Sequence, residues 1–197
     1  MPRDTYKTIP EASQGYFTEK RSRFLSFAIP ISSLQEVKET LAFYKRNYHD
    51  ARHICWAYML GSDRDNFHSS DDGEPSSTAG RPILGEINSR GLTNIMIIVV
   101  RYFGGIELGA GGLTSAYRAA ASSALSSARV VDMTVDASIT VSFGYSSLNL
   151  VARIIKEEDA IVVSRTFGEP CRFTVKVRLS RAEVIAERLT KAGAIHC

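Results

Sequence analysis

Three carboxylates lie close together in a stretch of the chain that has little to bury. Asp71, Asp72 and Glu74 stand in the sequence SDDGEPSSTAGRPIL, residues 70–84, among hydroxyl residues, glycines and prolines. Clustered carboxylate oxygens bind hard cations, and a desolvated carboxyl pair can share acid and base roles. At the start of a helix the same residues satisfy free N–H groups and complement the helix dipole. Because the spacing matches no complete metal loop, we expect no metal ion here.

A second stretch, residues 101–113 with the sequence RYFGGIELGAGGL, contains five glycines between a strand-like and a helix-like run. In this arrangement backbone N–H groups hold an anion at a helix N-terminus. The stretch is neither a Walker loop nor a dinucleotide fingerprint, because its spacing fits neither. Glycines also serve turns and close helix packing without any ligand. The first interpretation predicts a shallow anion or phosphate site, which replacing Gly111 and Gly112 with Ala should disturb.

Two histidines and a cysteine, His49, His53 and Cys55, invite a zinc interpretation. Zinc sites take four ligands, and no second ligand pair follows at a suitable spacing. A structural histidine and a buried cysteine are therefore favoured. No Gly-x-Ser-x-Gly elbow is present, so covalent hydrolysis has little support. We expect no cofactor.

Basic residues gather at two places, one in EKRSR near the start and one along the strand-like run RFTVKVRL. In the second group the basic side chains share the face opposite the apolar ones. Such a face suits phosphates, although it lacks the aromatic side chains that stack bases, and most such faces are simply solvated. The candidates for nucleic-acid binding are Lys20, Arg21, Arg23, Arg172, Lys176 and Arg178.

Composition is that of an ordinary folded protein. The 197 residues carry a net charge of +3, with 44% hydrophobic and 23% charged residues, which identifies no partner. Three widely spaced cysteines suit a reducing compartment better than a disulfide framework. The first ten residues lack an apolar leader, and the run 95–100 is far shorter than the roughly 20 residues of a membrane span. We expect a cytoplasmic protein with no membrane partner.

The hydrophobic pattern predicts an α+β protein of two domains, residues 1–135 and 136–197. In the first, strands are expected at 23–31, 51–60 and 94–100, the last covered on both faces, with helices at 34–48, from 83 and from about 113. In the second, the order βαββα indicates a small ferredoxin-like unit. Ser180 and Glu183 predict a capping box for its last helix. A closing strand would comprise only residues 194–197 or be absent.

The motifs SDDGEPSSTAGRP and VVRYFGGIELGAGGLTSAY together resemble the signature of the IMPACT family, in its bacterial YigZ-like branch. EKRSRFLSFA and DARHIC also resemble that family, so the likeness covers residues 17–130, and the remainder is similar to the small C-terminal domain of bacterial members. The resemblance implies an N-terminal domain like the second domain of ribosomal protein S-five, a fold shared with elongation factor G and small-molecule kinases. It also implies a ferredoxin-like C-terminal domain similar to one in elongation factor G. Eukaryotic relatives act in translational control under amino-acid starvation, binding a regulator of an initiation-factor kinase, with a different accessory domain.

In a family of that fold, the acidic and glycine loops are expected to form one site for a polar ligand, with an arginine contacting at least one carboxylate. No established catalytic residues accompany the resemblance. The candidate ligand or anion site comprises Asp71, Asp72, Glu74, Arg81, Arg101, Tyr102, Gly104, Gly105, Gly109, Gly111 and Gly112. The function we expect is non-catalytic regulation of translation or of a stress response, by binding RNA, the ribosome or a translation protein. The alternative is an enzyme that binds a nucleotide or a phosphorylated small molecule at the glycine-rich loop.

Overall fold

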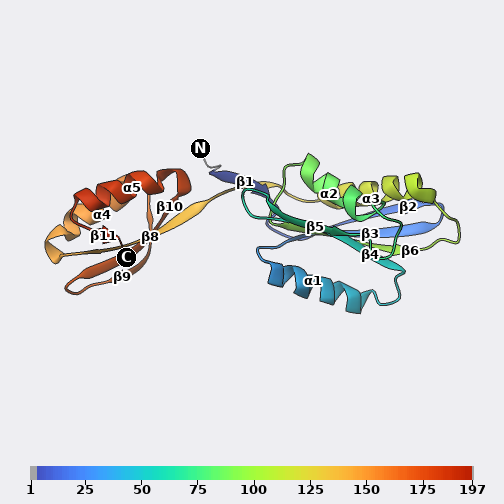
Figure 1. Cartoon of the computed structure of the whole chain (residues 1–197), viewed down its shortest axis with the longest axis horizontal. Coiled ribbons are helices and arrows are strands. Elements are labelled where there is room, and N and C mark those ends of the chain that lie inside the picture. The colour runs from blue at the N-terminus through green and yellow to red at the C-terminus, as the bar shows by residue number, and fades with distance from the viewer. Residues whose placement is uncertain (1–3, 197) are drawn as a thin grey trace. The chain divides into compact units, whose positions relative to one another are not determined.

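The structure, a computed structural model, describes residues 4–196 and has an α+β fold, as the sequence predicts (Figure 1). The chain divides into two compact units. One is Tyr6–Met133, and the other takes the residues from Thr134 onward together with the first residues up to Thr5. Among the described residues, no helix combines the length and the apolar character needed to cross a bilayer.

The unit Tyr6–Met133 is built on a five-stranded antiparallel sheet with the order β2-β3-β6-β4-β5. Its strands are β2 (Ser13–Glu19), β3 (Ser22–Pro30), β4 (His53–Leu60), β5 (Asn66–Ser70) and β6 (Ile95–Tyr102), and its helices are α1 (Leu34–Asn47), α2 (Gly80–Ser89) and α3 (Gly109–Ser126). A separate two-stranded sheet pairs β1 (Thr5–Thr8) with β7 (Val131–Thr134).

Strand β6 lies at the centre of the sheet, as its continuous apolar run predicts. All residues from Ile95 to Val100 are fully buried, because α1 covers one face of the sheet and α2 and α3 cover the other (Figure 1). Helix α3 approaches β2 closely because its packed face consists of small residues. A Cβ on Gly15 would lie 2.2 Å from the backbone N of Ala124, so this contact requires glycine. The hydroxyl of Ser26 donates to the carbonyl of Ala120 at 2.6 Å.

The second unit has the element order of a ferredoxin-like fold. Its elements are β8 (Asp136–Phe143), a 3₁₀ turn η1 (Tyr145–Ser147), α4 (Leu148–Glu157), β9 (Ile161–Thr166), β10 (Cys171–Arg178), α5 (Leu179–Lys191) and β11 (Ile195–His196). The strand order is β11-β8-β10-β9. Alternate residues of β10 face a core shared with the helices, so Phe173, Val175 and Val177 are buried while the residues between them are exposed or half-buried.

The predicted capping box at Ser180 is wrong. Helix α5 begins at Leu179, and its N-cap residue, Arg178, makes no side-chain cap hydrogen bond. The hydroxyl and backbone N–H of Ser180 instead donate to the Asp4 carboxylate, the latter at 2.7 Å. A partner 176 positions away cannot be inferred from a local motif.

Candidate functional site

A pocket of about 440 Å³ lies in the unit Tyr6–Met133, between the acidic loop, the end of β6 and the start of α3. Its lining residues come from these segments and from the residues just before and at the start of β4. They are Arg52, His53, Gly73, Glu74, Pro75, Arg101, Phe103, Glu107, Leu108, Gly109, Ala110 and Leu113. The two motifs therefore meet at one site.

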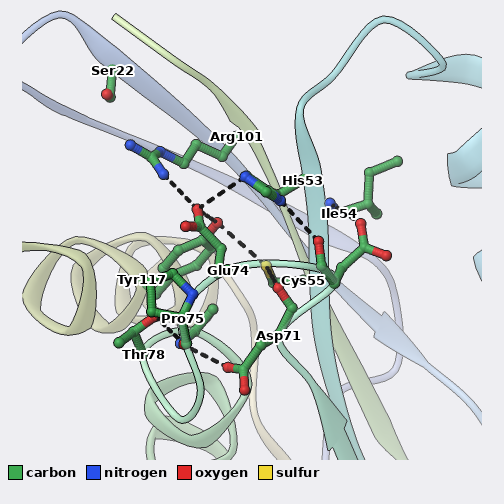
Figure 2. A network of polar contacts seen from close by, with 12 residues as sticks. Ser22, His53, Ile54, Cys55, Asp71, Glu74, Pro75, Thr78, Arg101 and Tyr117 are labelled. Atoms are coloured by element: carbon green, nitrogen blue, oxygen red, sulfur yellow. Dashed lines mark hydrogen bonds and ion pairs between the residues drawn. The ribbon is translucent and has the colours of Figure 1, made fainter. Parts of the chain in front are cut away.

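The floor of the pocket is a buried ion pair between Glu74 and Arg101. Nη1 of Arg101 donates to Oε1 of Glu74 at 2.6 Å, and the two side chains are only 7% and 3% exposed respectively. The hydroxyl of Tyr117 donates to the same oxygen at 2.8 Å. Figure 2 shows Arg101, Tyr117 and His53 converging on Glu74. The pair satisfies the requirement that a buried charge be compensated.

Below this pair, a cysteine and a tyrosine are held in their neutral forms. The thiol of Cys55 lies 3.3 Å from the Tyr117 hydroxyl and 3.0 Å from the carbonyl oxygen of Asp71, and it can donate to either. Burial raises the pKa of the Cys55 thiol and of the Tyr117 hydroxyl well above their usual ranges. Because the thiolate is the nucleophilic form, Cys55 is a structural thiol in this environment.

His53 connects the acidic loop to the ion pair. Its Nδ1 lies 2.8 Å from the carbonyl oxygen of Asp72, which can only accept, so Nδ1 carries the proton. Its Nε2 then faces Oε1 of Glu74 at 3.9 Å. The ring is positioned by the backbone of the loop, and His53 also lines the pocket.

The three carboxylates of the acidic loop have three different partners. Asp71 accepts backbone N–H groups from Ser77 at 2.8 Å and, with its other oxygen, from Ala79 and Gly80 at 3.0 and 2.8 Å. It therefore caps the start of α2, which has no cap of its own at Ala79. Asp72 accepts from the N–H of Ile54 at 2.7 Å. Of the three, Glu74 is the one whose side chain belongs to the pocket.

Comparison with known proteins shows which family has these two loops. A family model described as the Impact N-terminal domain matches residues 20–125, which include both loops. The chain belongs to the IMPACT family. It is similar to the IMPACT family member YvyE of Bacillus subtilis, with 32% identity over 95% of this chain and 86% of that protein, and to YigZ of Escherichia coli, with 31% identity over 75% and 74%. A solved structure described as that of a hypothetical protein matches with a TM-score of 0.75 and 25% identity, over 98% of this chain and 97% of the other.

Within this IMPACT-family site, the expected contact between an arginine and the acidic loop is made by Arg101. Arg81 is exposed in the first turn of α2 and does not line the pocket. Tyr102 also lies outside it, since its hydroxyl donates to Asp50 at 2.9 Å and the Arg23 guanidinium covers its ring at 4.9 Å.

The five glycines of this IMPACT-family motif have different roles. A Cβ on Gly104 would lie 2.1 Å from the backbone of Arg21, so this glycine lets the loop cross the turn between β2 and β3. Gly109 lines the pocket at the start of α3, while Gly105 and Gly111 face open space. A Cβ on Gly112 would lie 3.1 Å from that of Leu108. Space alone therefore does not require glycine at Gly111. Whether Ala at Gly111 and Gly112 disturbs an anion site stays a prediction.

Several pocket residues were not among the sequence candidates. Arg52, Pro75, Phe103, Glu107, Leu108, Ala110 and Leu113 line the pocket, and Tyr117 supports its floor. His53 and Cys55 were weighed as zinc ligands, and a structural histidine and a buried cysteine were favoured; Cys55 is buried. Tyr117 ends the second family motif, GGLTSAY, and its place one turn of helix beyond Leu113 could have indicated a role on the same helix face.

Proposed function

We propose that this protein is a non-catalytic cytoplasmic regulator of translation that binds RNA, free or within the ribosome, through the open face of its C-terminal sheet. The observation that carries the proposal is the exposure of Arg172, Lys176 and Arg178 on one face of β10. Membership of the IMPACT family supports the link to translation, because its eukaryotic members act in translational control.

The surroundings of these three cations suit a phosphate backbone. On the same face, Arg172 is paired in register with Ser142 of β8 and Thr166 of β9. Lys176 is paired with Ser138 of β8 and with the exposed Ile161 of β9. Hydroxyl groups of this kind donate to phosphate oxygens without reading sequence. Asp136, opposite Arg178, is the neighbouring carboxylate in this register. The helices α4 and α5 pack on the other face of the sheet, where the apolar residues of β10 lie.

A second group of cations occupies a different unit. Lys20 and Arg21 form the turn between β2 and β3, where both have positive φ, and Arg23 follows in β3. Their place beside Gly104 gives the loop a basic neighbour. We assign them a supporting role in RNA binding.

The test is a titration of labelled single-stranded RNA at several salt concentrations. Neutralising phosphates releases counterions, so the logarithm of affinity falls linearly with the logarithm of salt concentration. Removing Arg172, Lys176 and Arg178 by substitution with Ala should reduce the steepness of that line by roughly two on a single strand. The matched control, Arg153→Ala with Lys156→Ala and Lys191→Ala, removes the same charge from α4 and α5 and should keep the steepness.

Equal slopes for the wild type and the β10 variant would place the contact elsewhere. Absence of binding even at low salt would contradict RNA binding. We would then favour the alternative function, an enzyme that binds a nucleotide or a phosphorylated substrate in the pocket. If the β10 variant loses RNA binding but still associates with ribosomes, the partner is a translation protein.

A further inference from the structure

We propose that the pocket in the unit Tyr6–Met133 is a binding site for a small oxyanion with an apolar body, held by Arg101, Arg52 and the N-terminus of α3. This site is independent of the RNA-binding face, since every lining residue belongs to the other unit. The chemistry recognised is a phosphate or carboxylate group attached to a compact apolar or aromatic moiety.

Arg101 is the first argument for a ligand. Its side chain is 7% exposed and lines the pocket, yet within the described residues only Nη1 makes a hydrogen bond. Nε is fully buried and has no partner. An unpaired buried donor of this kind is costly. Because Nε has no exposed surface, it can pair with an oxyanion in the pocket only after the guanidinium turns toward it, and such charge-assisted pairing is strong. The aromatic rings of Phe24 and Phe103 lie 5.6 and 5.7 Å from the guanidinium carbon and restrict its position.

Helix α3 supplies the second contribution. It is 18 residues long, and its first turn contains Gly109 and Ala110 on the pocket wall. Its N-cap residue, Leu108, makes no side-chain cap hydrogen bond within the described part of the chain, and the first turn contains no acidic residue. Its first N–H groups therefore have no partner within the helix, and the positive end of the helix dipole faces the pocket. A helix end alone is not a site, but here it lies beside the buried and only partly paired Arg101.

The remaining lining residues indicate the chemistry of the ligand's body, the part beyond its oxyanion group. Pro75, Phe103, Leu108 and Leu113 provide apolar surface, and the Phe103 side chain is 47% exposed although it borders a pocket. These residues suit an apolar or aromatic body.

The pocket also contains two carboxylates, which set the sign of the expected charge effects. The charge of Glu74 is compensated by Arg101. Glu107 is exposed at the rim and opposes an anion, while Arg52 at the rim favours one. Neutralising Glu107 should therefore raise the affinity for an oxyanion, and neutralising Arg52 should lower it. A cationic ligand would show the reverse pattern.

The experiment is calorimetric titration of the full chain with inorganic phosphate, phenyl phosphate and benzoate, at constant ionic strength set with chloride. Binding should be saturable in the millimolar range or tighter, with phenyl phosphate tighter than inorganic phosphate. Amide resonances of Gly109 and Ala110 should shift during the titration. Binding by benzoate as well as phenyl phosphate supports a general oxyanion site, and binding by the phosphates alone supports a phosphate site.

Variants test the geometry without disturbing the buried pair. Ala110→Glu places a negative charge at the end of α3, which favours the helix but should weaken phenyl phosphate about tenfold or more. Ser115→Glu adds the same charge to the exposed face of α3 outside the pocket and should bind like the wild type. Arg52→Gln should weaken binding, and Glu107→Gln should tighten it.

Three results would overturn the proposal. They are an absence of saturable binding by all three anions, equal binding by the Ala110→Glu and Ser115→Glu variants, and weaker binding after Glu107→Gln. Equal affinity for inorganic phosphate and phenyl phosphate would overturn the apolar part of the ligand. The RNA titration is a separate test, because its variants change only residues of β10, α4 and α5.

Discussion

Glu74 and Arg101 lie 27 positions apart in sequence and form a buried ion pair of 2.6 Å at the bottom of a pocket. Glu74 comes from the acidic loop and Arg101 from the end of the central strand. Their contact joins the two long motifs of the family into one structure. The same carboxylate oxygen accepts a hydrogen bond from the hydroxyl of Tyr117 in α3. It therefore links the acidic loop, β6 and α3.

Separating the pair should destabilise the protein strongly. Arg101→Met leaves a buried carboxylate without its counter-charge, which costs about 3–5 kcal/mol of unfolding free energy. The double variant Glu74→Gln with Arg101→Met should lose much less than the sum of the single losses, as measured by urea denaturation in a double-mutant cycle. The exposed pair of Arg153 and Glu157 serves as control and should show little coupling, because solvent screens it. Additive single losses would show that the two side chains are not coupled.

Asp71 should be important for stability rather than for ligand binding. Asp71→Ala leaves the N–H groups of Ser77, Ala79 and Gly80 without their acceptor, and we expect a loss of about 2 kcal/mol. Hydrogen exchange at the Ala79 and Gly80 amides should accelerate. Asp63→Ala, at an exposed carboxylate, should change stability by less than about 0.5 kcal/mol. Comparable losses for both variants would refute the capping role.

Two glycines of the same loop should respond oppositely to alanine. In Gly104→Ala the new Cβ would lie 2.1 and 2.3 Å from backbone atoms of Arg21 and Ser22, so the loop or the turn must move. We expect a loss of at least about 2 kcal/mol from such overpacking. Gly111→Ala meets open space inside α3 and should stabilise the protein by about 0.5 kcal/mol. Thermal denaturation compares the two variants with the wild type. A melting temperature of Gly111→Ala below that of the wild type would contradict the prediction.

The buried thiol predicts that stability falls at alkaline pH. Burial raises the pKa of Cys55 in the folded protein, whereas in the unfolded chain the thiol ionises near its ordinary value of about 8.5. Above that pH the unfolded state binds fewer protons than the folded state, so the free energy of unfolding decreases by up to about 1.4 kcal/mol per pH unit. Below it the contribution is fully present.

The measurement is urea denaturation from pH 7.5 to 9.5 of the wild type and of Cys55→Ala. The variant should be less stable at pH 7.5 but should show a flatter dependence on pH, because its unfolded state has no ionising thiol at this position. Parallel curves for the two proteins would show that Cys55 does not ionise on unfolding in this range.

Much of the fold follows from local patterns in the sequence. The apolar run at 95–100 predicted a central strand because only a strand covered on both faces can bury every side chain. The edge strands β2 and β5 escaped prediction because they are partly exposed and need no regular apolar face. The start of α3 at Gly109 was placed about one turn too late, since glycines weaken the helical signal there.

By itself the sequence determined the family, the α+β class and the two loops that form the site. Only the tertiary structure decided the role of each residue in them. The neighbouring carboxylates of Asp71, Asp72 and Glu74 could not be told apart by spacing, because their roles depend on partners brought by α2, β4 and β6. Arg101 rather than Arg81 pairs with Glu74 because β6 delivers it to a buried position, where an unpaired charge would be costly. Long-range contacts of this kind depend on packing, and no local pattern encodes them.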